Sequence, residues 1–246
     1  MFKYCPNIYT GTLDDKCVED AIQHARDEFP NEACGAIING EYVKFKNESE
    51  TPELSFEIKD DLFFVEYINK NVECLVHSHN DSNQASFVDQ VQQKELDLPS
   101  LIINLKNKSL MDCIVFGEKE LAPIEGRPFF WGAFDCVTCV SDYLINKFGV
   151  GIDYPPHEMG FWGKQKTYFE SYIEGDDKFM WVSPDDLKVG DMLLYNIDGS
   201  RHINHIGVYV NENGQVLHHM YNNISGLYPI NFNKKYLRKA WRLRND

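Results

Sequence analysis

The 246-residue sequence lacks an apolar run long enough to cross a membrane, which takes about 20 consecutive apolar residues. The segment from Met1 to Pro6 also lacks the apolar core of a secretory signal. We therefore expect a protein that resides in a cytoplasm when it is made and that does not insert into a membrane.

Basic side chains are scarce, with 24 Lys and Arg against 38 Asp and Glu and a net charge of -14. The imbalance lies in residues 1–127, which hold 24 acidic and 12 basic side chains, whereas residues 128–246 hold 14 and 12. Because phosphate binding needs Lys and Arg, this argues against nucleic acid as a partner. A basic cluster near the C-terminus predicts a solvated helix or strand face, or alternatively a docking surface for an acidic partner. It comprises Lys234, Lys235, Arg238, Lys239, Arg242 and Arg244.

The sequence also lacks the even set of cysteines that a disulfide framework requires. It has seven: Cys5, Cys17, Cys34, Cys74, Cys113, Cys136 and Cys139. In a chain of this length without a visible signal, we expect most of these thiols to be buried and unpaired, as small apolar side chains.

Hydrophobic periodicity and turn residues predict an α+β protein of two domains. A segment with prolines and glycines at 118–127 is the expected linker between domain 1–117 and domain 128–246. Helices are predicted over 14–29, 60–69, 87–98 and 136–148, and residues 151–186 are expected to be irregular. Strands are predicted over 34–38, 42–45, 74–77, 100–105, 111–116, 191–195, 205–210 and 216–219, the first two as a hairpin around Asn39-Gly40.

Cys136 stands at the start of a predicted helix, where the helix dipole lowers the pKa of a thiol and favours the nucleophilic thiolate. His205 opens one predicted strand and His218 ends the next. Antiparallel pairing would bring the two imidazoles together, so that one acts as proton carrier and the other orients it. The alternative is that all three are buried structural residues.

The C-terminal pattern resembles the NlpC/P60 family of papain-like thiol peptidases that cut peptide stems of bacterial cell walls. It is carried by Phe134-Asp135-Cys136, then Leu187-Lys-Val-Gly-Asp-Met-Leu-Leu194, Asn204-His205-Ile-Gly-Val-Tyr-Val210 and Leu217-His218-His219. The resemblance implies Cys136 as nucleophile, His205 as general base and His218 as orienting residue. It also implies bacterial peptidoglycan as substrate.

Two features depart from that family. The common Asp-Cys-Ser-Gly reads Asp-Cys-Val-Thr, and aromatic residues at 129–131 stand in the region where many members place a Tyr. Cys139 and His219 are rival site residues. We expect Cys139 to face the core, and strand alternation to place His219 on the face opposite His218.

The N-terminal half holds a second set of residues with chemistry. In Val76-His77-Ser78-His79 both imidazoles lie on one face of a strand, and Asp89 begins a predicted helix. Two imidazoles and a carboxylate leave one position open on a tetrahedral Zn²⁺, as in catalytic zinc sites. Glu32 is the candidate general base and Ser86 a candidate oxyanion donor. The alternative is that the histidines are ordinary strand residues.

This pattern of Glu, then His-x-His, then Ser-x-x-Asp resembles the JAMM, or MPN, metallopeptidase motif over roughly residues 10–117. The resemblance implies Zn²⁺ held by His77, His79 and Asp89, with Glu32 as base. Asn80 stands where Pro is usual, and the gap from His79 to Ser86 is one residue shorter than usual.

A JAMM domain followed by an NlpC/P60 domain is a narrow pairing, similar to a family of tail proteins of lambda-like siphophages. The pairing implies assembly in the host cytoplasm, residence at the virion tail tip and other tail-tip proteins as partners. The alternatives are a tail assembly factor, or a structural adaptor in which one or both sites are inert.

Overall fold

The computed structural model describes residues 8–82, 84–118, 123–157, 159–160, 172, 175–197, 199–211 and 213–244, without the side chains of 232 and 233. The chain divides into two compact units, 1–120 and 121–246. Each end of the predicted linker is hydrogen-bonded to the unit next to it. The Tyr9 hydroxyl donates to Glu118 (3.1 Å) in the N-terminal unit, and the N–H of Arg127 donates to the Ser225 hydroxyl (2.9 Å) in the C-terminal unit. Residues 119–122 lie outside the described residues, as do Cys5 and the N-terminal segment.

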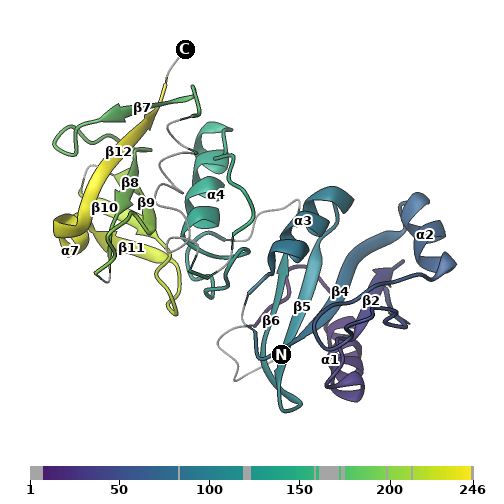
Figure 1. The fold of residues 1–246 in the computed structure, drawn as a ribbon. Helices are drawn as coiled ribbons and strands as arrows, with labels where there is room; N and C mark the ends of the chain where they lie inside the picture. The colour runs from purple at the N-terminus through teal and green to yellow at the C-terminus, as the bar shows by residue number, and fades with distance from the viewer. Residues whose placement is uncertain are drawn as a thin grey trace. The chain divides into compact units, whose positions relative to one another are not determined.

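The N-terminal unit is built on one mixed sheet with strand order β1-β6-β5-β4-β2-β3 (Figure 1). Its strands are β1 (Ile8–Tyr9), β2 (Cys34–Ile38), β3 (Glu41–Phe45), β4 (Val72–Asn80), β5 (Ser100–Lys106) and β6 (Ser109–Phe116). Its helices are α1 (Asp15–Glu28), α2 (Asp61–Ile68) and α3 (Phe87–Leu96). The predicted helices and strands of this half are confirmed, within a few residues at their ends.

Alternation along the strands gives the sheet two apolar faces. Cys74 and Val76 of β4 pack with the apolar side of α1, whereas Leu75 packs with Phe63 of α2. His77 and His79 therefore face the side opposite α1. The hairpin of β2 and β3 turns at Asn39-Gly40, where both residues have positive φ (51° and 77°), as a two-residue hairpin loop requires.

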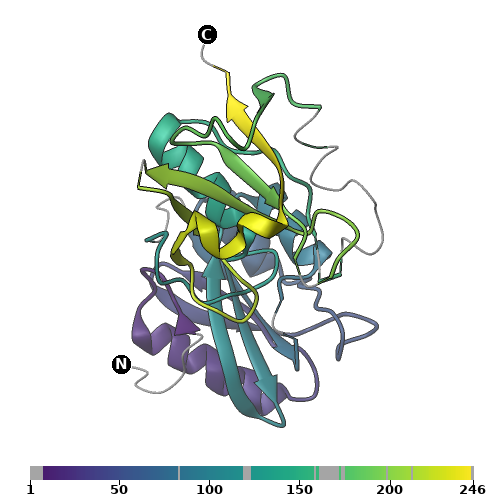
Figure 2. The ribbon, with the colours of Figure 1, turned by 90° about the vertical axis from the view of Figure 1, so that its left-hand side faces the viewer.

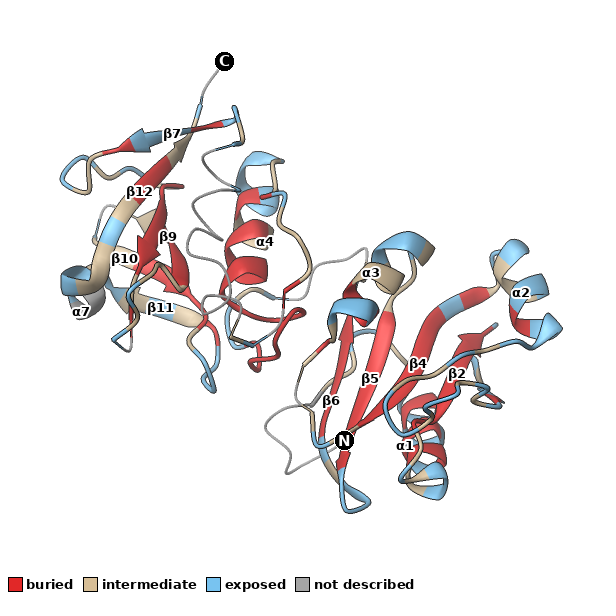
Figure 3. Ribbon diagram, in the orientation of Figure 1, coloured by how far each residue is buried: buried red, intermediate tan, exposed pale blue. Residues whose placement is uncertain are grey.

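The C-terminal unit has an antiparallel sheet with strand order β11-β10-β9-β8-β12-β7. Its elements are α4 (Cys136–Phe148), β7 (Phe179–Val182), β8 (Met192–Tyr195), β9 (His205–Asn211), β10 (Gln215–His218), β11 (Gly226–Pro229), α7 (Ile230–Asn233), the 3-10 turn η1 (Lys234–Tyr236) and β12 (Leu237–Leu243). Figure 2 shows the yellow β12 beside the green strands, in keeping with its pairing with β7 and β8. Buried residues concentrate in the N-terminal turns of α4 and in the first half of β9 (Figure 3).

The expectation that residues 151–186 are irregular is wrong at β7, which pairs with β12 at the edge of the sheet. Neither β11 nor β12 was predicted. In β12, Arg242 of the basic cluster bonds to Asp191 with both guanidinium Nε and Nη2 at 2.8 Å. Part of the basic C-terminal cluster therefore holds the sheet together, which a charge pattern alone does not indicate.

Six cysteines lie in the described residues, and all six are buried and free, as expected. Among the described residues, no helix combines the length and the apolar character that spanning a bilayer takes.

Candidate active site and metal centre

Cys136 is the first residue of α4, and its position is fixed by the Asp135 cap. The Asp135 side chain accepts hydrogen bonds from the backbone N–H groups of Val137 (2.9 Å) and Thr138 (3.1 Å). The Thr138 hydroxyl in turn accepts from the N–H of Asp135 (2.8 Å). This reciprocal cap anchors the helix start, where the helix dipole favours an anion.

His205 and His218 come together as antiparallel pairing predicts. His218 of β10 lies opposite Gly207 of β9, and its Nδ1 is 2.8 Å from Nε2 of His205. A Cβ at Gly207 would lie 2.8 Å from the Val216 side chain, so the glycine permits the close strand approach. Because His205 uses Nε2 toward His218, its Nδ1 is left for proton exchange with a nucleophile.

Cys136 and His205 line one cavity of about 540 Å³. Aromatic side chains of Phe129, Trp131 and Tyr221 form part of its wall, and Arg201 and His202 lie on the loop between β8 and β9. None of the described lining residues carries a carboxylate. The sequence analysis did not identify Arg201, because a lone Arg in a polar turn carries no motif signal.

Burial sets the charge state of this site. Burial, and next the Asp135 carboxylate, raise the pKa of the Cys136 thiol, while the backbone N–H of Ile206 acts in the opposite direction. Burial and the neighbouring imidazoles lower the pKa of His205, and burial lowers that of His218 to about 4. These shifts favour a neutral Cys136 thiol and a neutral His205 imidazole in the resting site. The sequence predicts a thiolate stabilised by the helix dipole, but burial outweighs the dipole.

The two rival residues differ in their positions. Cys139 is fully buried in the apolar core, as expected. His219 follows the end of β10 and lines the same cavity as Cys136, with Nε2 3.1 Å from the carbonyl oxygen of Asn223. His218, in contrast, bonds to His205 and is not among the residues that line this cavity.

A buried histidine beside the nucleophile was also missed by the sequence analysis. His157 is almost fully buried, and its Nε2 lies 2.7 Å from Oδ2 of Asp135. It follows Pro155-Pro156 in a stretch without helical or strand periodicity, so only the folded chain places it at the start of α4.

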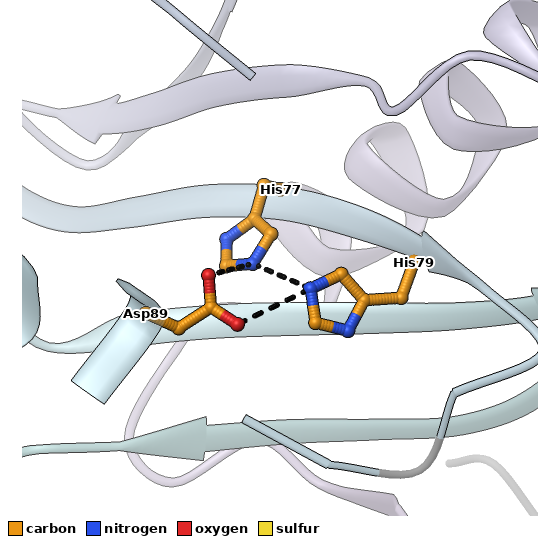
Figure 4. A group of neighbouring side chains, drawn as sticks. All are labelled: His77, His79 and Asp89. Carbon is orange, nitrogen blue, oxygen red and sulfur yellow. Dashed lines mark hydrogen bonds and ion pairs between the residues drawn. The ribbon is translucent and has the colours of Figure 1, made fainter. Parts of the chain in front are cut away.

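In the N-terminal unit, His77, His79 and Asp89 form a buried cluster (Figure 4). The two Nε2 atoms lie 3.1 Å apart, and Asp89 places one carboxylate oxygen 3.2 Å from His77 and the other 3.3 Å from His79. β4 supplies both imidazoles on one face, and α3 supplies the carboxylate in its first turn.

This donor set fits a zinc ion. Zn–N and Zn–O distances of about 2.0–2.1 Å place tetrahedral ligand atoms about 3.3–3.4 Å apart, close to the separations in the cluster. Both Nδ1 atoms are buried and find no hydrogen-bond partner among the described residues, although metal-bound imidazoles usually donate from this second nitrogen. Asp112 also has an unpaired oxygen, and strand register aligns His79, Asn104 and Asp112 across β4, β5 and β6.

Glu32 and Ser86 line the same pocket of about 360 Å³ as His79 and Asp89. Glu32 is buried, with Oε1 4.0 Å from Nε2 of His79, and burial raises the pKa of its carboxyl group. Ser86 caps α3: its hydroxyl accepts from the N–H of Asp89 at 3.2 Å. Of the residues predicted for the metal site, Glu32, His79, Ser86 and Asp89 thus line one pocket. His77 contacts Asp89 of that pocket.

Comparison with known proteins assigns the C-terminal pattern. Residues 126–243 match the model of the NlpC/P60 family. Over 227 residues the chain is 26% identical to the tail tip assembly protein K of Escherichia phage N15, covering 88% of this chain and 89% of that protein. The predicted resemblances to NlpC/P60 and to a family of phage tail proteins are thereby confirmed. The JAMM resemblance rests on the N-terminal residues themselves.

Two solved structures are similar at lower levels. One is described as similar to a lipoprotein of the NLP/P60 family, from Staphylococcus aureus, and is 17% identical with a TM-score of 0.33, covering 50% of this chain and 38% of that chain. The other is an NlpC/P60 family protein from Bacillus cereus, 12% identical with a TM-score of 0.35, covering 94% and 67%. At TM-scores below 0.5 these likenesses do not establish a shared fold.

Proposed function

We propose that this chain is a phage tail-tip component whose C-terminal unit is a papain-like cysteine peptidase acting on peptidoglycan stem peptides. The observation that carries the proposal is that Cys136 and His205 line one cavity, with His218 bonded to His205, within the segment that matches NlpC/P60. The similarity to a tail tip assembly protein supports a place at the virion tail tip. Assembly in the host cytoplasm beside other tail-tip proteins belongs to the same proposal.

The geometry supports a simple proton route. Neutral His205 takes the thiol proton as the Cys136 sulfur attacks the scissile carbonyl carbon, while the Nδ1–Nε2 bond with His218 holds the ring. The backbone N–H of Cys136 is the donor at the start of α4 that stabilises the oxyanion, since those of Val137 and Thr138 already donate to Asp135. The His205 imidazolium then gives its proton to the leaving amine, and water hydrolyses the resulting thioester with His205 as base.

The cavity also supports a choice of substrate. Arg201 is exposed at the cavity, and in the described residues neither Arg201 nor the His202 ring has a side-chain partner. A cation beside an aromatic wall fits a peptide that carries a free carboxylate. Peptidoglycan stems are acidic peptides, and they are the substrate that the NlpC/P60 resemblance implies.

The N-terminal unit is proposed to be a JAMM-type zinc site, with His77, His79 and Asp89 holding the ion. Zn²⁺ there would supply Lewis acidity for amide hydrolysis. Glu32 is placed to hold or move a proton, and its raised pKa suits a base near neutral pH. Ser86 holds Asp89 in position through the helix cap and lines the pocket that a substrate would enter.

A cell-wall zymogram with the full chain tests this proposal. We expect wild type to clear the wall, Cys136→Ala to abolish clearing, and His77→Ala to leave it intact. Cys139→Ala is the matched control, because it removes a buried thiol one helical turn away that does not line the cavity. Clearing by Cys136→Ala would refute the peptidase assignment.

The alternative is a tail assembly factor or structural adaptor with one or both sites inactive. The raised pKa of Cys136 and the departures from the JAMM spacing favour it. Zinc analysis and thiol alkylation of the purified chain separate the two functions. Absence of zinc together with an unreactive Cys136 would identify the chain as an adaptor. Normal tails in a phage that carries His77→Ala would show that assembly does not need the zinc site.

A further inference from the structure

The residue before the candidate nucleophile is a fully buried carboxylate. Asp135 has no exposed surface, and its two oxygens serve four donors. Oδ1 accepts from the N–H groups of Val137 and Thr138, whereas Oδ2 accepts from the N–H of Gly132 (2.9 Å) and lies 2.7 Å from Nε2 of His157. A single side chain therefore joins the start of α4, the segment before it and residues 155–157.

The surroundings of His157 determine its protonation. Its Nδ1 lies 3.2 Å from the carbonyl oxygen of Pro155, which can only accept a hydrogen bond. Its Nε2 faces Asp135; burial alone would raise the pKa of that carboxyl group, but His157 and the backbone donors hold it at about 2. Both ring nitrogens thus face acceptors, an arrangement that favours a ring donating from both nitrogens as an imidazolium.

The charge of this pair matters for Cys136. A buried carboxylate one residue away opposes formation of a thiolate, and Asp135 does raise the pKa of Cys136. An imidazolium 2.7 Å from that carboxylate opposes this repulsion, since the two charges form a compact buried pair. Other titratable groups interact with Asp135 or Cys136: Cys139, Asp142, Tyr154, His205 and His219. Arg127 lowers the pKa of the neighbouring Asp142 and Cys139.

We propose that His157 is a positioning residue for the nucleophile: as an imidazolium it neutralises Asp135 and locks the start of α4, so that Cys136 can ionise to His205. The inference rests on the proposed function, because it assumes that Cys136 reacts. It adds a residue that no motif of the sequence marks. Its role is exerted through Asp135, without contact with substrate.

The test measures the pH dependence of Cys136 alkylation by iodoacetamide in the full chain, in a Cys139→Ala background. His157→Gln keeps an N–H donor near Asp135 but removes the positive charge. We expect the alkylation profile of Cys136 to move to higher pH by about one unit, which is about tenfold slower alkylation at neutral pH. On wall substrate, kcat should fall while KM is kept.

Two comparisons separate charge from structure. The double variant Asp135→Asn/His157→Gln removes both charges, and we expect its alkylation profile to return toward that of wild type. His24→Gln, which replaces a buried histidine of the N-terminal unit, should leave the profile in place. A His157→Gln profile equal to that of wild type, or a double variant as impaired as the single one, would overturn the proposal.

Imidazole nitrogen NMR of the wild type keeps the inference testable even where His157→Gln does not fold. Both His157 nitrogens should carry protons at pH 7, and a neutral ring would refute the proposal. A different result defeats the proposed function: a wild-type chain that neither clears cell wall nor alkylates at Cys136 faster than at its buried thiols. The NMR signal still decides the charge of His157 in that case.

Discussion

The two units each contain a pair of histidines in contact, but the pairs have opposite electrostatic surroundings. His77 and His79 share Asp89 between them, and Asp89 raises the pKa of His79 against the effect of burial. His205 and His218 have no carboxylate between them, and burial lowers the pKa of both. The shared carboxylate favours a positive charge at the first pair, whereas burial favours the neutral form of the second pair.

The largest effect should come from removing the neutral base. His205→Gln keeps a hydrogen-bonding side chain but cannot carry the proton, so kcat for wall hydrolysis should fall by about 10²–10⁴-fold. Initial-rate assays on purified cell wall measure it. His219→Gln is the matched control, since His219 lines the same cavity. A comparable loss of kcat in that variant would contradict the assignment of His205 as the general base.

Removing the shared carboxylate should abolish the cation site. Asp89→Asn should lower bound zinc from about one per chain toward none, because a neutral amide replaces the anionic ligand. Metal analysis after dialysis measures the zinc content. Asp81→Asn is the control, because it removes an exposed carboxylate that is paired with Lys106. Full zinc retention by Asp89→Asn would show that the shared carboxylate is not a zinc ligand.

The neutral histidines should make the C-terminal unit sensitive to acid. In the folded chain the pKa values of His218 and His219 are lowered to about 4, against about 6.5 when unfolded. Between these values the unfolded chain binds more protons, so stability falls as pH drops from about 6.5 to 4, by on the order of 2–3 kcal/mol for each group.

Tryptophan fluorescence can follow that loss in the full chain, because all four tryptophans lie after residue 120. Urea unfolding at a series of pH values should show a shallower pH dependence for His219→Gln than for wild type. Equal slopes for the two proteins would mean that the His219 ring is not held neutral in the fold.

The smallest effect is expected at the cavity rim. Arg201→Met should raise KM for an acidic stem peptide about tenfold, since an exposed charge-assisted contact contributes about 1–1.5 kcal/mol, and should leave kcat nearly unchanged. The same variant should not affect a peptide whose carboxylates are amidated. Arg238→Met, an exposed arginine of the basic cluster, serves as control, and equal KM changes would remove Arg201 from substrate recognition.

The two sites also differ in how far they could be predicted. His77, His79 and Asp89 lie within 13 residues, on a strand and the helix that follows it, so period and spacing alone bring them together. The cysteine site gathers Cys136, His205 and His218 from one helix and two strands. These three residues were predicted from the family's motif spacing and from strand pairing. The side chains that form the wall of the cavity, such as Arg201, were not predicted.

The missed features share one physical cause. β12 reads as a basic segment, yet pairing with β7 and β8 buries Ala240 and Trp241 and bonds Arg242 to Asp191. His157 lies in a stretch without periodicity, yet the fold places its ring against Asp135. In each case a contact distant in sequence decides the outcome, and local periodicity carries no information about it.

By itself the sequence determined most helices and strands, the paired histidines of both sites and the candidate nucleophile at the start of α4. Those features follow from local period, capping residues and short spacings. Only the tertiary structure decided the charge states: which imidazoles are neutral, which is paired with a carboxylate, and that His157 meets Asp135 behind Cys136. Burial and neighbouring charges set a pKa, and both depend on chain segments that the fold brings together.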